Sequence, residues 1–170
     1  PIEGLPASMR LAVRGVGGQG NLFLGKVLAD LALRAGFGNV VKGETHGMAQ
    51  LGGPVISTFA CGDVHSPSLG PGSADVLIAL EQSEVLRPGF LDMLKPDGML
   101  LVSRTRIVPA GVDEADYPAM EQVRQVLGDL RVVEFDALSE AQSIGDRVGR
   151  TANVIALGML VFGERNSIWV

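Results

Sequence analysis

The sequence predicts a three-layer α/β/α domain built on a mostly parallel but mixed sheet. Segments typical of strands alternate with segments typical of helices along the chain. A glycine-rich turn joins the first strand to the first helix, and residues 74–81 are almost entirely apolar until Glu81, as in a parallel strand covered on both faces. A length of 170 residues suits one domain. We therefore expect a single domain over residues 1–170, with a flexible N-terminus over residues 1–8.

The first two elements are a strand at about residues 9–15 and a helix at about residues 19–35. Gly36 is expected to end that helix, because glycine enters the left-handed cap without a Cβ clash. Leucine and valine lie on nearly every face of the helix, which predicts cover on both sides. A short strand at about residues 39–42 then leads into a second glycine-rich loop, residues 44–53.

The middle of the chain supplies the antiparallel element of the sheet. β-Branched and aromatic residues predict a strand at residues 54–61. The pair Gly62-Asp63 indicates a turn, and residues 64–66 are expected to return as a short hairpin strand. A loop rich in proline, serine and glycine precedes the apolar strand that ends at Glu81.

The second half of the chain repeats the alternation. Ser83 is expected to cap a helix that continues to residue 94, and residues 95–98, with the sequence Lys-Pro-Asp-Gly, predict a tight turn into a strand at 99–103. Residues 104–117 are expected to be irregular because proline and glycine interrupt them. The remaining elements are expected to be a helix at about 119–127, a strand at 131–135 and helices at about 137–144 and 152–162.

Composition excludes several classes of function. The chain has 14 basic and 19 acidic residues and no basic run, so nucleic acid is not an expected partner. A single cysteine, Cys61, cannot form a disulfide within the chain or ligate an iron–sulfur cluster, and it is expected to be a small core residue. No signal-like segment or membrane span is evident, so we expect a cytoplasmic protein without a membrane partner. The apolar share of 46% favours a partner chain.

The first glycine loop, Gly15-Val-Gly-Gly-Gln-Gly20, fits the G-x-G-x-x-G pattern of Rossmann-like dinucleotide sites through Gly15, Gly17 and Gly20. Such a site needs an acid near the end of the second strand, where Glu44 lies. This pattern favours a nicotinamide or flavin site. In the alternative interpretation, the glycines only permit tight packing of the strand against the helix.

Few polar residues are candidates for chemistry. Glu81 lies at the carboxyl end of a strand, where α/β sheets place their binding crevice. Asn153, near the start of a helix, is expected either to satisfy free N–H groups or to hold the glycine loop. His46 has no second ligand at metal spacing, so we expect neither a metal site nor catalysis there. No nucleophile arrangement is recognisable, and we assign no catalytic residue.

Several motifs occur together in a fixed order. They are Gly15 to Gly20, His46-Gly-Met-Ala-Gln-Leu-Gly-Gly53, Ser66-Pro67, Ala74 to Leu80, Lys95-Pro-Asp-Gly98, and Ala152-Asn153 with Leu157-Gly158. Together they resemble the gamma subunit or domain of 2-oxoacid:ferredoxin oxidoreductases over residues 10–163. The segment 79–87 is most similar to the beta subunit of the indolepyruvate branch of these enzymes.

The resemblance implies a subunit of an enzyme that decarboxylates a 2-oxoacid such as pyruvate or indolepyruvate, releases acyl-CoA and passes electrons to ferredoxin. It implies that thiamine diphosphate, magnesium and iron–sulfur clusters lie in partner subunits, with coenzyme A as co-substrate. The chain itself has no Gly-Asp-Gly motif followed by paired asparagines, the signature of thiamine diphosphate sites. The residues expected to contact a ligand or partner are Gly15, Gly17, Gly18, Gln19, Gly20, His46, Gln50, Gly52, Gly53, Glu81 and Asn153.

One residue departs from the family pattern. Many relatives have arginine before the paired glycines of the second loop, whereas this chain has Leu51. A guanidinium contact to a substrate carboxylate or a CoA phosphate is therefore not available at that position.

The sequence thus leaves three hypotheses for the function of the chain. It is a subunit that is inactive alone, a free-standing dinucleotide-binding domain, or an assembly module whose glycine loops only pack.

Overall fold

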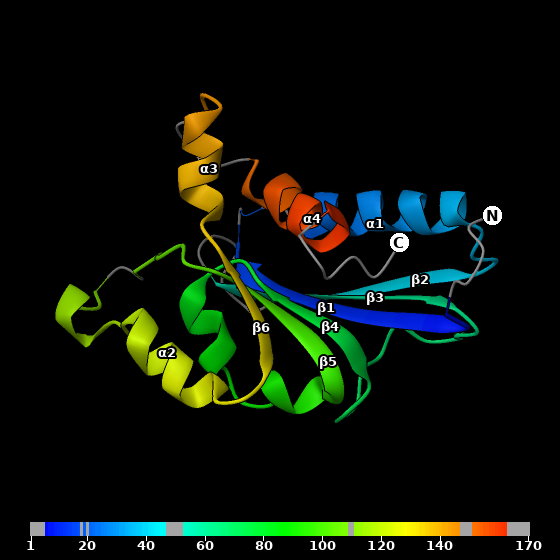
Figure 1. Ribbon diagram of the computed structural model, residues 1–170, viewed down its shortest axis with the longest axis horizontal. Coiled ribbons are helices and arrows are strands. Elements are labelled where there is room, and N and C mark those ends of the chain that lie inside the picture. Colours follow the sequence, from blue (N-terminus) through cyan, green and yellow to red (C-terminus); the bar gives the residue numbers. More distant parts are fainter. Residues whose placement is uncertain are drawn as a thin grey trace.

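The computed structural model of the chain describes residues 6–17, 19, 21–46, 53–108, 111–146 and 151–162 (Figure 1). The expected flexible N-terminus therefore lies mostly outside the described residues. The strands are β1 (Ser8–Val16), β2 (Val40–His46), β3 (Pro54–Gly62), β4 (Ala74–Ala79), β5 (Leu94–Ser103) and β6 (Arg131–Phe135). The helices are α1 (Asn21–Ala35), α2 (Met120–Leu127), α3 (Ala137–Ser143) and α4 (Ala152–Phe162), with short 3-10 helices η1 (Gln82–Leu86), η2 (Leu91–Met93) and η3 (Glu114–Asp116).

The described strands form one six-stranded sheet in the order β2-β3-β1-β4-β5-β6. The neighbouring strands β1, β4, β5 and β6 are parallel to one another, whereas β3 runs antiparallel to both β1 and β2. The mixed, mostly parallel sheet is therefore confirmed. The strand β2 is longer than expected, because its pairing with β3 continues to His46 opposite Val55.

The antiparallel element is β3 itself, and the expected hairpin strand at residues 64–66 is wrong. After Gly62, the amide of Val64 donates to the carbonyl oxygen of Gly62 at 2.9 Å, which folds the chain back within one turn. The carbonyl of Val64 accepts from the Asn39 side chain, so its backbone bonds serve the turn rather than a ladder. Val64 is buried at 2% exposure and anchors this turn.

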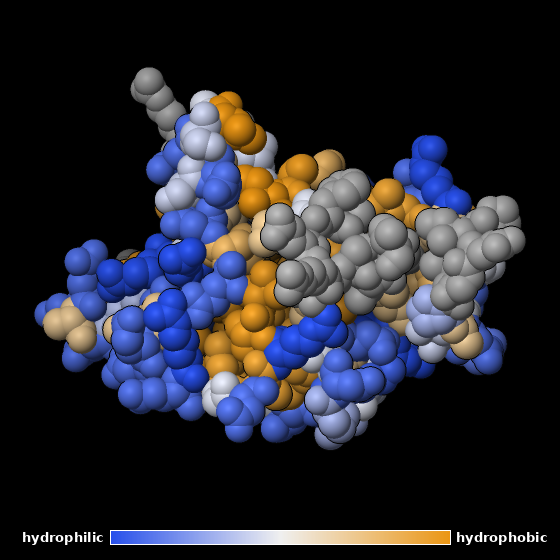
Figure 2. Space-filling view, in the orientation of Figure 1, coloured by the Kyte–Doolittle hydropathy of each residue, from blue (hydrophilic) through white to orange (hydrophobic). Residues whose placement is uncertain are grey.

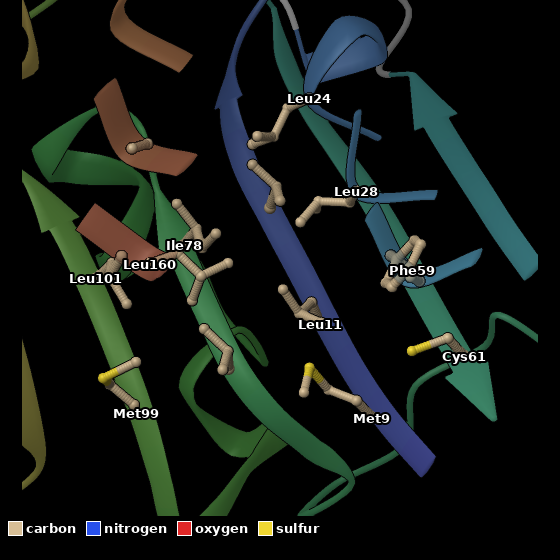
Figure 3. Packing of buried hydrophobic residues seen from close by; sticks show 14 of the residues in the cluster. Met9, Leu11, Leu24, Leu28, Phe59, Cys61, Ile78, Met99, Leu101 and Leu160 are labelled. Atoms are coloured by element: carbon tan, nitrogen blue, oxygen red, sulfur yellow. The ribbon is translucent and has the colours of Figure 1, made fainter. Parts of the chain in front are cut away.

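Helices α1 and α4 cover one face of the sheet (Figure 1). Alternate strand residues point to this face because successive side chains of a strand lie on opposite sides. Figure 3 shows Leu24 and Leu28 of α1 on the side of the sheet to which Leu11 of β1 and Phe59 of β3 point, and all four belong to one apolar core. The helix ends as expected at Gly36, which has a φ of 113° and donates its N–H to Ala32 at 3.2 Å.

The opposite face of the sheet packs against η1 and α2 (Figure 1). The side chains that point there are the intervening residues of the same strands, including Leu77 and Leu100, and they meet Val85, Val123 and Leu127. Two apolar cores thus lie on the two faces of one sheet. The three-layer α/β/α architecture is confirmed, because strands that are buried on both faces need cover on both.

The expected helix over residues 83–94 is wrong. The chain instead forms the two short 3-10 helices η1 and η2, separated by Pro88 and Gly89. Proline disfavours the helical conformation of the residue before it, and Gly89 adopts a φ of +79° that ends any regular helix. The expected turn at residues 95–98 lies inside β5, where the pairing with β4 shifts register between Ala74 and Val76.

Candidate functional site

The parallel strands β1, β4, β5 and β6 end at one edge of the sheet. After β1 the chain passes through α1 to β2 on one side of the sheet, whereas β4 is followed by β5 and β6 on the other side. The direction of winding therefore changes between β1 and β4. In open α/β sheets, this change opens a crevice beyond the carboxyl ends of the strands, which is where ligands bind.

At this change of winding direction, the side-chain amide of Gln19 bonds to the ends of both strands. Its Oε1 accepts from the backbone N–H of Val16 at 2.7 Å, and its Nε2 donates to the carbonyl oxygen of Leu80 at 3.0 Å. Leu80 follows β4, and its own N–H donates to the carbonyl oxygen of Arg14 in β1 at 2.9 Å. The amide thus joins the ends of β1 and β4, while the expected ligand contact of Gln19 stays a prediction.

The two hydrogen bonds of the Gln19 amide form a brace between β1 and β4, and residues Gly17 and Gly53 contact each other beside it. The N–H of Gly17 donates to the carbonyl oxygen of Gly53 at 2.9 Å, which extends the β1–β3 pairing one step past Val16 and Pro54. Gly15 is buried in β1, opposite Val55. The structure therefore brings three predicted residues, Gly15, Gly17 and Gly53, to one corner of the sheet.

The remaining loop predictions cannot be placed in the same way. His46 is the last residue of β2 and reaches the same edge of the sheet, but its side chain lies outside the described residues. The structure also does not describe five further residues of the two loops, which are Gly18, Gly20, Gln50, Leu51 and Gly52. Their contact with a ligand or partner stays a prediction.

Glu81 is buried at 1% exposure directly after β4. Its Oε2 accepts from the Ser83 backbone N–H at 3.0 Å and from the Ser83 hydroxyl at 2.5 Å, so Glu81 caps η1. Its Oε1 accepts from the Ile107 N–H at 3.4 Å, in the loop after β5. Ser83 is therefore the donor and not the cap, which corrects the expected role. Burial raises the pKa of Glu81, although the hydrogen bonds from Ser83 and Ile107 oppose the rise.

Sequence reasoning missed a second buried carboxylate, Glu84, which is 1% exposed. Its two oxygens pair with Arg14 Nε at 3.0 Å and with Arg87 Nε at 3.1 Å. The Arg14 guanidinium also lies 5.7 Å from the centre of the Phe90 ring. Arg14 is a charged residue that follows the apolar run Leu11 to Val13 of β1, and this was the signal in the sequence. Its partner is 70 positions away in the sequence and could not be deduced from spacing.

Two other predicted residues are buried. Asn153, in the first turn of α4, is 2% exposed, and its Oδ1 accepts from the Val154 N–H at 2.8 Å. Cys61 lies in β3 within the core under α1, and burial raises its pKa to about 11. The expectation that Cys61 is a core residue is confirmed, because a thiol that stays protonated packs as a small apolar side chain.

Helix α4 is apolar on more than its buried face. Val154 is 46% exposed, and Ile155, Leu157 and Met159 are only partly buried against the core. Figure 2 shows apolar surface around α4 and along the neighbouring β6 edge of the sheet, bordered by hydrophilic surface. Contiguous apolar surface of this kind marks binding faces. No helix in the part of the chain that the structure describes is long and apolar enough to cross a membrane.

Comparisons with known proteins agree with this architecture. The family model described as pyruvate ferredoxin/flavodoxin oxidoreductase matches residues 10–163. The chain is similar to the indolepyruvate oxidoreductase subunit IorB of Archaeoglobus fulgidus, with 38% identity over 157 residues, 89% of this chain and 75% of that protein. It is also similar to the IorB subunit of Thermococcus kodakarensis, with 35% identity over 88% of this chain and 75% of that protein.

Solved structures give the same likeness. The pyruvate oxidoreductase subunit PORC of Thermotoga maritima superposes with a TM-score of 0.64 at 26% identity, over 93% of this chain and 78% of that one. The gamma subunit of a keto/oxoacid ferredoxin oxidoreductase from Geobacter sulfurreducens has a TM-score of 0.62 at 25% identity, over 90% of this chain and 75% of that one. These proteins are subunits of oxoacid:ferredoxin oxidoreductases, and the comparisons do not support a free-standing dinucleotide-binding domain.

Proposed function

Because the chain belongs to the pyruvate ferredoxin/flavodoxin oxidoreductase family, we propose that it is a subunit of a 2-oxoacid:ferredoxin oxidoreductase and is inactive alone. The complex oxidatively decarboxylates a 2-oxoacid to acyl-CoA and passes the electrons to ferredoxin. The family match over residues 10–163 carries this proposal, since it spans every described strand from β2 to β6 and all but the start of β1.

The cofactors of this reaction belong to partner chains. Each iron–sulfur cluster takes about four thiolate ligands, and this chain has one cysteine, whose burial in β3 raises its pKa to about 11. The residues present do not fit a cluster. We assign the clusters, thiamine diphosphate and magnesium to partner subunits in the cytoplasm, with coenzyme A as co-substrate.

Within the complex, the carboxyl edge of the sheet is the part of this chain that faces the reaction pocket or a partner subunit. Support comes from the Gly17–Gly53 contact, which lies beside the change in winding direction. The side-chain amide of Gln19 holds the strand ends there through its hydrogen bonds to the backbone of Val16 and Leu80. The role of this edge is to shape and close the pocket, while partner chains supply the reacting groups.

The apolar surface of α4 is the proposed contact with a partner subunit. Val154 exposes an apolar side chain on this helix, which costs free energy unless another chain covers it. Val126 on α2 is comparably exposed, at 56% against 46% for Val154, but it lies on the opposite layer of the domain. The two valines therefore make a matched pair for a test.

The proposal is tested by tagging the chain in its native source and purifying its complex. Larger chains that contain iron and thiamine diphosphate should be recovered with it, and the complex should reduce ferredoxin when a 2-oxoacid and coenzyme A are supplied. Indolepyruvate, pyruvate and 2-oxoglutarate are compared as substrates. Val154→Asp should reduce recovery of the partners, whereas Val126→Asp should not. An isolated chain that turns over a 2-oxoacid by itself would overturn the proposal.

A further inference from the structure

A cavity of about 460 Å³ opens where the chain leaves β5 and approaches α2. Its walls include Gln82, Arg104, Arg106, Glu114, Tyr117 and Met120. The volume lies within the range of small-molecule sites, which is roughly 300–1,000 Å³. Its position beyond the carboxyl end of a parallel strand is also where α/β sheets bind ligands. None of these residues forms the Gln19 brace or the glycine corner.

Two arginines that line this cavity, Arg104 and Arg106, have no ion-pair partner in the part of the chain that the structure describes. Within the described residues, neither Arg104 nor Arg106 has a carboxylate oxygen within 4.0 Å of its nitrogens. Arg104 lies near Glu134 and Asp136 and helps to lower the pKa of both, but at longer range. Glu114 is the one carboxylate among the described walls of this cavity, and Arg104 also borders a neighbouring hollow lined by Glu134, Asp136 and Glu140.

The geometry of Arg106 leaves its hydrogen-bond donors available. Its guanidinium carbon lies 5.1 Å from the centre of the Tyr117 ring. A cation–π contact of this kind leaves the N–H groups that point away from the ring free to bind an oxyanion. Tyr117 is buried at 6% exposure and holds this platform in place. The contact with Tyr117 therefore holds the Arg106 side chain in position before any ligand binds.

The other walls fit the organic part of a ligand. Ala119, the N-cap of α2, and Met120, its first residue, line the cavity together with Tyr117. The N-terminus of a helix carries partial positive charge and favours an anion nearby. Two guanidinium groups and a helix N-terminus match a doubly charged anion better than a single carboxylate.

We propose that this cavity is an anion-binding pocket in which Arg104 and Arg106 hold the phosphate group of a small ligand. The pocket is a feature of this chain alone and does not depend on the assembly proposed above. The phosphate group comes either from inorganic phosphate or from an organic phosphate ester, whose carbon part would lie against Tyr117 and Met120.

The test is a calorimetric titration of the purified full-length chain with inorganic phosphate and, separately, with phenyl phosphate, at matched ionic strength in chloride. Arg104→Gln and Arg106→Gln should each weaken phosphate binding roughly tenfold or more, since each removes a charge-assisted hydrogen bond. Arg34→Gln is the matched control, because this substitution removes the same charge from α1, where Arg34 is 76% exposed and far from the cavity. Circular dichroism verifies that every variant folds.

Tighter binding of phenyl phosphate than of inorganic phosphate would assign an organic phosphate, and equal affinities would assign the free anion. Arg106→Lys keeps the charge but loses the planar guanidinium, so this variant should bind phosphate with an intermediate affinity. The proposal is overturned if the unmodified chain shows no phosphate binding beyond that of the chloride control. Equal affinities of the Arg104, Arg106 and Arg34 variants would overturn it as well.

Discussion

Gln19 donates a hydrogen bond from Nε2 to the carbonyl oxygen of Leu80 at 3.0 Å, so one side chain joins the ends of two parallel strands. The same amide accepts from the Val16 N–H at 2.7 Å. Both the oxygen and the nitrogen of the amide are therefore hydrogen-bonded to backbone groups at the point where the sheet changes its winding direction. The second glycine of the G-x-G-x-x-G pattern, Gly17, is likewise bonded to the neighbouring loop at Gly53.

Replacing Gln19 with alanine should lower the free energy of unfolding by about 1–3 kcal/mol, because two hydrogen bonds are lost. Urea denaturation measures the change, and Gln125→Ala, on the exposed face of α2, is the control that should be near neutral. Gln19→Glu keeps an acceptor for Val16 but sets a second acceptor against the Leu80 carbonyl. At neutral pH it should also destabilise the chain, and full stability of that variant would refute the brace.

The buried carboxyl of Glu81 should make stability depend on pH. Its pKa is raised in the folded chain, so the folded state binds the proton more tightly than the unfolded state. The contribution of Glu81 to stability is therefore greatest at low pH and declines as the pH rises above the ordinary value of 4.5. The decline ends once the pH passes the folded-state pKa.

The measurement compares the unfolding free energies of the unmodified chain and Glu81→Gln from about pH 4 to about pH 8. Since all other groups are shared, the difference between the two proteins isolates this carboxyl. We expect the unmodified chain to lose stability relative to Glu81→Gln as the pH rises. A constant difference across this range, or one of opposite sign, would contradict the raised pKa.

Two leucines of α1 should differ sharply in their contribution to stability. Leu28 is fully buried against the sheet (Figure 3), whereas Leu33 is 57% exposed. Leu28→Ala should cost about 2–5 kcal/mol, because it removes buried methyl groups and leaves a cavity. Leu33→Ala should cost less than about 0.5 kcal/mol. Denaturant unfolding of the isolated chain checks both values, and similar costs would mean that α1 packs on another face.

The buried hydroxyl of Tyr117 has no hydrogen-bond partner among the described residues. Removing an unsatisfied buried polar group relieves its desolvation cost. Tyr117→Phe should therefore leave the melting temperature of the ligand-free chain unchanged or raise it. Ser57→Ala provides a second case, since the Ser57 hydroxyl is also buried and unpartnered in the described part of the chain. A clear drop in the melting temperature of Tyr117→Phe would reveal a partner for the hydroxyl.

Local sequence signals predicted most of the elements, because they depend on neighbours along the chain. The glycine turn after β1, the cap at Gly36 and the apolar run of β4 are each readable within about ten residues. The helix expected over residues 83–94 failed despite a local signal, since Pro88 lies in its middle. The expected cap at Ser83 failed because η1 begins at Gln82, so Ser83 lies within its first turn and Glu81 occupies the N-cap position.

The sequence by itself determined the fold class and the family, since both rest on residue types at short spacings in a fixed order. Only the tertiary structure decided which distant groups meet: Gln19 with Leu80, Glu84 with Arg14, and Gly17 with Gly53. These contacts join segments whose separation along the chain carries no periodic signal. Strand order and register place them side by side, and those depend on how both apolar faces of the sheet are buried at once.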